Sequence, residues 1–100
     1  MDAAMMNVNI VSGLLMPVFQ RYGVNRAVLF GSVAKGTNGK NSDLDILVDS
    51  GLRGLRFIGL LEDVREAVKM DVDLLDISHI EKGSPIEEEI QKTGVVIYEK

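Results

Sequence analysis

Two aspartates separated by a single residue, Asp43 and Asp45, stand at the start of a short apolar segment that ends at Val48. Apolar side chains alternate with them, so the segment predicts a β-strand over Asp43–Val48 with both carboxylates on one face. Residues two apart on a strand lie roughly 6.5–7 Å apart along it. Their carboxylates can therefore converge on two divalent cations about 3.5–4 Å apart, the spacing of two-metal sites. Carboxylate oxygens are ligands that Mg²⁺ prefers, so the pair predicts a Mg²⁺ site.

A Gly-Ser pair, Gly31 and Ser32, ends an apolar run that predicts a strand over Arg26–Phe30. Gly31 lets the backbone turn sharply and approach a phosphate closely, which a Cβ atom would obstruct. Ser32 offers a hydroxyl and a backbone N–H near the start of a short expected helix, where amides favour anions. Without a ligand, the same residue would be a helix N-cap. A phosphate-binding turn facing two metal-binding carboxylates outlines a site for nucleotide transfer.

A third strand is predicted over Asp71–Ile77, and it carries three acidic residues, Asp71, Asp73 and Asp76. Alternation puts Asp71 and Asp73 on one face and Asp76 on the other, where we expect it to face solvent. Either Asp71 or Asp73 could therefore be the third carboxylate of the site. A solvated acid near the start of the strand is the alternative for either residue.

Other polar side chains near these motifs have weaker functional claims. Lys35 and Lys40 flank the predicted site and could steady phosphate oxygens, although lysines are mostly found on protein surfaces. His79 has no second histidine at ligand spacing, so we expect a structural role. The acidic run Glu87–Glu89 is expected to form the solvated face of the last helix.

The remaining elements must position these motifs. A helix is predicted over about residues 4–21, either as one kinked helix or as two short ones, because an interior proline, Pro17, removes a backbone hydrogen bond. Gly23 is expected to end it. The segment 37–42 is expected to be a loop. Three further elements are predicted: an amphipathic helix spanning Phe57 to Val68, a helix over Pro85–Thr93 and a short strand over Val95–Tyr98.

Composition narrows the class of protein. The 100 residues are 46% hydrophobic and 26% charged, with no repeat or linker, which predicts one α/β domain over residues 1–100. No apolar run approaches the roughly 20 residues of a membrane helix, and acidic Asp2 without a basic cluster argues against a signal peptide. The absence of cysteine favours the cytoplasm. A net charge of −4 argues against binding a long nucleic acid, but not against a single nucleotide.

The segments 30–36 (FGSVAKG) and 42–48 (SDLDILV) resemble the signature of the minimal nucleotidyltransferases. These are small members of the DNA polymerase β-like superfamily, often antitoxins paired with HEPN-domain toxins. The resemblance continues through 72–75 (VDLL) to the tail 94–99 (GVVIYE) and so covers nearly the whole chain. Lys35 departs from the pattern, because such proteins often have arginine there. Lysine keeps the positive charge but lacks the bidentate fork.

The resemblance implies the polymerase β-like nucleotidyltransferase fold, a small mixed β-sheet flanked by helices. It points to Asp73 as the third carboxylate, which with Asp43 and Asp45 would bind two Mg²⁺ ions and form the catalytic set. Gly31, Ser32 and Lys35 would then bind the nucleotide. The implied activity is that of a cytoplasmic protein adenylyltransferase, which transfers AMP from ATP to a hydroxyl. Related antitoxins modify a tyrosine of their HEPN toxin, so such a toxin is the expected acceptor and partner.

Two other functions use the same motifs differently. A non-catalytic antitoxin would neutralise its toxin by binding alone, but such a protein needs neither the Gly-Ser turn nor the paired aspartates. A nucleotide-binding subunit of a small-molecule nucleotidyltransferase would need a second subunit to supply the acceptor pocket, because 100 residues leave little chain for one.

Overall fold

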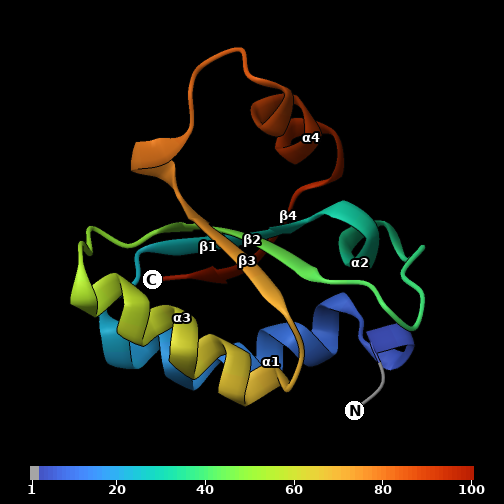
Figure 1. Ribbon diagram of the computed structural model, residues 1–100, viewed down its shortest axis with the longest axis horizontal. Helices are drawn as coiled ribbons and strands as arrows, with labels where there is room; N and C mark the ends of the chain where they lie inside the picture. The colour runs from blue at the N-terminus through green and yellow to red at the C-terminus, as the bar shows by residue number, and fades with distance from the viewer. Residues whose placement is uncertain (1–2) are drawn as a thin grey trace.

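Residues 3–100, which the computed structural model describes, form a four-stranded mixed sheet with helices on both sides (Figure 1). Met1 and Asp2 lie outside the described residues, and with them lies part of the N-terminal segment that argues against a signal peptide. In chain order the elements are η1 (Ala3–Met5), α1 (Val8–Tyr22), β1 (Arg26–Phe30), α2 (Gly31–Lys35), β2 (Leu44–Asp49), α3 (Leu55–Val68), β3 (Val72–Asp76), η2 (Ile77–His79), α4 (Pro85–Thr93) and β4 (Val95–Glu99).

The strands lie in the order β3-β2-β1-β4, with β1 antiparallel to both β2 and β4. The β2 and β3 strands are parallel, because α3 carries the chain back between them. The prediction of a small mixed sheet flanked by helices is therefore confirmed. The predicted strand Arg26–Phe30 is confirmed residue for residue, whereas the β2 strand begins at Leu44, one residue later than expected.

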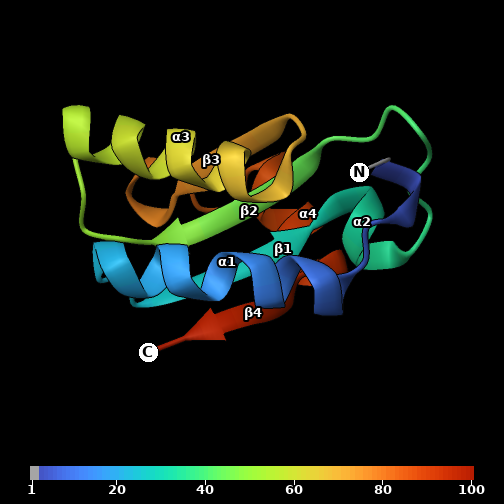
Figure 2. The same cartoon turned by 90° about the horizontal axis from the view of Figure 1, so that it is seen from below.

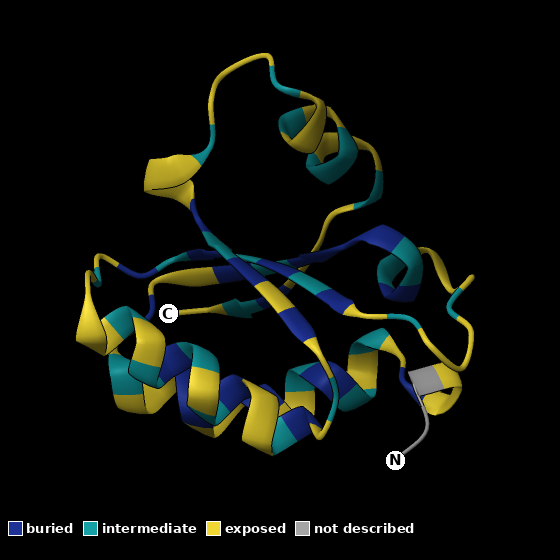
Figure 3. Cartoon of the chain, viewed as in Figure 1, coloured by how far each residue is buried: buried dark blue, intermediate teal, exposed yellow. Residues whose placement is uncertain are grey.

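The α1 and α3 helices cover one face of the sheet and close the main hydrophobic core (Figure 2). The alternation predicted for β2 is confirmed, since Leu44, Ile46 and Val48 are fully buried on this face while Asp45, on the other face, is not (Figure 3). The largest fully buried side chains of this core are Leu15 and Phe19 on α1, Leu29 on β1, Leu44 and Ile46 on β2, and Leu60 on α3.

The α1 helix runs unbroken through Pro17, so the alternative of two short helices is wrong. The predicted start near residue 4 is also wrong, because α1 begins at Val8 and Ala3–Met5 form the separate 3-10 turn η1. Its first turn is capped by Asn7, whose side chain accepts a hydrogen bond of 3.0 Å from the Ile10 N–H. Gly23 ends the helix in the left-handed conformation, at φ 68°, as predicted. None of the helices within residues 3–100 has the length and apolar character that a membrane crossing requires.

The opposite face of the sheet is only partly covered, with α4 on that side (Figure 1). The α2 helix lies at the end of β1, and its Val33 belongs to the main hydrophobic core. The predicted bounds of α4 are confirmed, and it packs on α2 and on β1. Between β3 and α4 the chain arches away from the sheet through η2 (Figure 1). This arrangement brings the C-terminal helix beside the turn at Gly31, although more than fifty residues separate them in the sequence.

The expectation that Asp76 faces solvent is wrong. Alternation does put it opposite Asp73, but that face carries Val72 and Leu74 and is the buried one. Burial alone would raise the pKa of Asp76, but hydrogen bonds from the hydroxyl and backbone N–H groups of Ser50 and Ser78 outweigh it and leave the pKa below its usual value. The buried carboxylate thus joins the ends of β2 and β3.

Candidate active site

Gly31 forms the sharp turn between β1 and α2, directly after the last residue of β1 that pairs with β2. That last pair joins Phe30 to Asp45. Gly31 has a φ of +77°, and a Cβ atom on it would collide with Oδ2 of Asp45 and lie 3.3 Å from its Cγ. Glycine is therefore required here for its backbone conformation and for the close approach of a carboxylate.

The three predicted site aspartates lie at one end of the parallel strands. Asp45 on β2 is in register with Asp73 on β3, and Asp43 directly precedes β2. Adjacent strands are about 4.8 Å apart, so the two register partners carry neighbouring carboxylates. Asp45 is half-buried, whereas Asp43 and Asp73 are exposed. Asp71 lies just outside β3, where its carbonyl accepts a 3.0 Å hydrogen bond from the Leu44 N–H.

Asp45 occupies an unfavourable place for a negative charge. Burial raises the pKa of its carboxyl group, and the negative charges of Asp73, Asp43 and Glu89 raise it further. The ionised form of Asp45 therefore opposes folding, increasingly so as the pH rises from the ordinary aspartate value to the raised one. A bound cation would relieve this repulsion.

The donor set fits a hard divalent cation that is bound together with a substrate. Among residues 3–100 no three His, Asp or Glu side chains are grouped closely enough to hold a metal ion by themselves. However, Mg²⁺ is commonly bound through one or two carboxylates and substrate phosphates rather than in an all-protein cage. Asp43, Asp45 and Asp73 supply such carboxylates beside the Gly31 turn.

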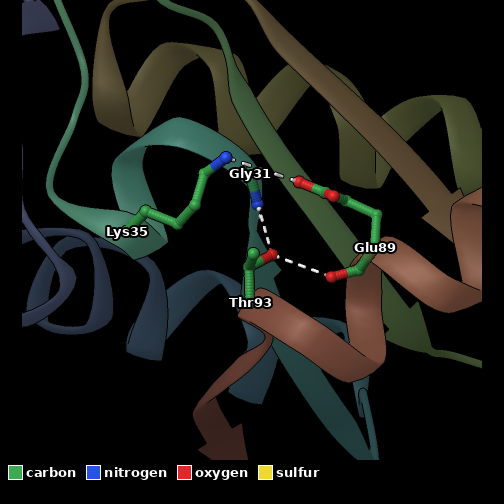
Figure 4. A network of polar contacts seen from close by, with 4 residues as sticks. All are labelled: Gly31, Lys35, Glu89 and Thr93. Carbon is green, nitrogen blue, oxygen red and sulfur yellow. Dashed lines mark hydrogen bonds and ion pairs between the residues drawn. The ribbon is translucent and has the colours of Figure 1, made fainter.

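The α4 helix contributes two residues that the sequence prediction missed, Thr93 and Glu89 (Figure 4). The Gly31 N–H donates to Oγ1 of Thr93 at 3.0 Å, and the Thr93 hydroxyl donates to the Glu89 carbonyl at 2.9 Å. Nζ of Lys35 lies 3.9 Å from Oε1 of Glu89. The expectation that Glu87–Glu89 is a solvated face is thus wrong for Glu89, which is half-buried and faces the turn.

The sequence contained a weak signal for these residues. Glu89 and Thr93 are four residues apart, so they lie on one face of a helix. Nothing in that spacing shows which face meets the Gly31 turn, because the orientation of α4 depends on its packing against α2 and β1.

The remaining predicted site residues divide into two groups. Ser32 and Lys35 both lie on α2, beside the Gly31 turn, whereas Lys40 lies in the exposed loop before β2. The alternative role of Ser32 as a helix N-cap is wrong, because α2 already begins at Gly31 and Phe30 takes the N-cap position. Exposed His79 belongs to η2, which follows the opposite end of β3.

A groove of about 590 Å³ also lies away from the carboxylates. It is lined by Leu52, Arg53, Gly54, Phe57, Ile58, Ser78 and His79. These residues follow the ends of β2 and β3 at which the strands leave the sheet, whereas Asp43 and Asp45 stand where β2 enters it. The groove is therefore not part of the candidate site.

Comparisons with known proteins agree on the class of the protein. Residues 15–100 match the family model described as "Polymerase beta, Nucleotidyltransferase". A protein of Methanocaldococcus jannaschii named "Putative protein adenylyltransferase" is 34% identical over 77 residues, which cover 75% of this chain and 83% of the relative.

Solved structures show the same architecture. A chain of a toxin–antitoxin crystal structure with AMP-PNP is 25% identical, with a TM-score of 0.71 over 95% of this chain and 75% of that one. A chain in the complex of a tri-AMPylated Shewanella oneidensis HEPN toxin with an MNT antitoxin is 18% identical, with a TM-score of 0.69 over 93% and 73% of the two chains, and this likeness concerns the fold.

The family match covers the Gly31 turn, the carboxylates on β2 and β3, and the α4 helix, so it contains every element of the candidate site. The resemblance predicted from the sequence motifs is confirmed, as is the class of enzyme that it implied. The chain therefore belongs to the polymerase β family of nucleotidyltransferases.

Proposed function

We propose that this nucleotidyltransferase transfers AMP from ATP to a tyrosine hydroxyl of a HEPN toxin, in a Mg²⁺-dependent reaction, and so acts as an antitoxin. The observation that carries the proposal is the crowding of carboxylates around Asp45 directly beside the Gly31 turn. The adenylyltransferase name of the archaeal relative supports AMP as the transferred group. AMP-PNP in one structural neighbour supports ATP as its source, and the AMPylated HEPN toxin in another supports the acceptor.

The phosphates would lie against the turn between β1 and α2. The Gly31 N–H is already bonded to Thr93, so the backbone N–H and hydroxyl of Ser32 are the turn groups left for a phosphate oxygen. Lys35, one helical turn further on, would contribute a positive charge. These groups position the triphosphate and stabilise its charge, which is most of what a protein contributes to transfer of this kind.

Asp43, Asp45 and Asp73 would hold the metal, which when bound neutralises phosphate charge and lowers the pKa of the acceptor hydroxyl. The hydroxyl oxygen attacks the α-phosphorus, the bond to the bridging oxygen of the β-phosphate breaks, and pyrophosphate leaves. We assign to Asp73 the acceptance of the proton from the hydroxyl, because it is the exposed register partner of Asp45.

The test is incubation of the protein with Mg²⁺, its cognate HEPN protein and ATP labelled at either the α- or the γ-phosphate. Label from the α position alone should appear on the toxin and be absent without Mg²⁺. An Asp43→Asn/Asp45→Asn variant should transfer nothing, whereas Asp71→Asn, an exposed carboxylate outside the proposed set, should retain activity.

Two results would contradict the proposal. Label from the γ position would indicate phosphoryl rather than nucleotidyl transfer. The double variant should also fail to neutralise the toxin. If it neutralises the toxin although no protein is labelled, the protein acts as an antitoxin by binding alone.

A further inference from the structure

The contact between Lys35 and Glu89 joins the phosphate turn to the C-terminal helix (Figure 4). Lys35 ends α2, the short helix that starts at the Gly31 turn, and Glu89 lies on α4. The ion pair spans 3.9 Å, and about half of each side chain is exposed, 47% for Lys35 and 42% for Glu89. An exposed ion pair at this distance contributes little to folding stability. Moving Lys35 from Glu89 to another anion therefore costs little free energy.

The position of Glu89 is unexpected for a site that binds a triphosphate. Its charge acts on Asp45 together with those of Asp43 and Asp73, so it belongs to the same acidic surroundings. A fourth carboxylate there opposes an incoming polyanion. Among residues 3–100, the carboxylate of Glu89 forms one ion pair, with Lys35, the residue on α2 that a phosphate would also attract.

The backbone of Glu89 is anchored independently of this ion pair. Its carbonyl accepts the hydroxyl of Thr93, and Oγ1 of Thr93 accepts the Gly31 N–H. Because this chain of hydrogen bonds does not involve Lys35, the lysine can leave Glu89 while α4 and the turn stay joined.

From this geometry we infer that Glu89 is a positioning residue that holds the ammonium of Lys35 beside the turn and releases it to a nucleotide phosphate on binding. The phosphate is the stronger partner, because it carries more charge and more acceptor oxygens than a carboxylate. Glu89 therefore competes with the nucleotide for Lys35 and weakens nucleotide binding. The inference rests on the proposed function, since it requires a nucleotide at this site.

The test measures the dissociation constant of Mg²⁺–AMP-PNP by calorimetry for wild type, Glu89→Gln, Lys35→Met and the double variant. Glu89→Gln should bind about two- to five-fold more tightly, the range expected for loss of a competing exposed ion pair. Lys35→Met should bind more weakly. In the Lys35→Met background most of the gain from Glu89→Gln should disappear, because no lysine remains to be released and only the direct repulsion between Glu89 and the phosphates is relieved.

A matched control separates this mechanism from a general effect of charge. Glu88→Gln removes the same charge from the neighbouring, exposed position of α4 and should leave affinity unchanged. The inference is overturned if Glu89→Gln fails to tighten binding, or if its gain is undiminished in the Lys35→Met background. A wild-type protein that binds no AMP-PNP would instead contradict the proposed function and the inference with it.

Discussion

Gly31 and Asp45 are the two residues at which the requirements of fold and chemistry meet. The last β1–β2 pair brings the Asp45 carboxylate against the Gly31 backbone, where a Cβ atom would fit only if the Asp45 side chain moved. The same contact buries part of a carboxyl group that has three acidic neighbours. The protein thus places an unstable charge beside the turn, which is typical of sites built for a cation or a proton.

We predict opposite effects of Asp45→Asn on activity and stability. Transfer should fall at least about 100-fold, because a central charge of the site is lost. Since the pKa of Asp45 is raised in the folded protein, its ionised form opposes folding at neutral pH, so the metal-free variant should unfold at a higher temperature than wild type at pH 7.

Thermal unfolding followed over pH checks this prediction. The advantage of Asp45→Asn should shrink as the pH falls through the raised pKa of Asp45 towards 3.8, the ordinary aspartate value, since wild-type Asp45 is then protonated as well. Added Mg²⁺ and AMP-PNP should raise the unfolding temperature of wild type but not of the variant. A variant less stable than wild type at pH 7 would contradict the conclusion that the charge of Asp45 opposes folding.

A second prediction compares two glycines with the same backbone conformation. Gly31 and Gly36 have φ values of 77° and 75°, but a Cβ atom would meet nothing within 4 Å at Gly36. Gly36→Ala should therefore cost only the left-handed conformation, about 1–2 kcal/mol. Gly31→Ala should cost about 1–3 kcal/mol more, because the new methyl group displaces Asp45. Urea unfolding gives both values, and equal losses would contradict the steric argument.

At the scale of the elements, α4 is the unexpected contributor to the site. Its last turn supplies the acceptor for the buried Gly31 N–H, and its middle turn supplies Glu89. Because β4 follows α4 directly and pairs with β1, the edge strand holds the helix over the turn. The C-terminal segment therefore supports the shape of the Gly31 turn.

Thr93→Val should loosen this connection without a change of side-chain shape. It leaves the buried Gly31 N–H without an acceptor, which should lower the free energy of unfolding by about 1–3 kcal/mol. Thr93→Ser keeps the hydroxyl and should cost less than about 1 kcal/mol, the value of the lost methyl group. The measurements are chemical denaturation and amide hydrogen exchange at Gly31, and equal effects of the two variants would contradict the assigned role.

On the scale of the whole molecule, the sheet separates two tasks. The face under α1 and α3 carries the main hydrophobic core, and the opposite face, on the side of α4, carries the acids of the candidate site. Asp76 ties the far ends of β2 and β3 together from within the buried face. Its role in stability is therefore separate in space from the chemistry.

Asp76 should account for part of the loss of folding stability at acidic pH. Its pKa is lowered in the folded protein, so its contribution is present above the ordinary aspartate value of 3.8 and is lost as the pH falls through the lower, folded value. Asp76→Asn leaves one of the two Ser donor pairs without an acceptor and should cost about 2–4 kcal/mol at pH 7. Urea unfolding at pH 7 and near pH 3 should show the difference shrinking in acid, and a constant difference would contradict this account.

The sequence by itself determined most of the elements and the residues proposed for most of the candidate site. Local patterns suffice for these features, because the Gly-Ser pair interrupts an apolar run, alternation orients the acids of β2, and Pro85 and Gly94 bracket α4. The parallel course of β2 and β3 was implicit in the helix between them, and it brings Asp43, Asp45 and Asp73 to one end.

What only the tertiary structure decided is which face of each element is covered and by what. Alternation separates Asp73 from Asp76 but does not show that α1 and α3 cover the face of Asp76. Helical spacing relates Glu89 to Thr93 but does not show that both meet the Gly31 turn. Periodicity reports relative orientation within one element, whereas burial and contacts depend on packing between elements distant in the chain.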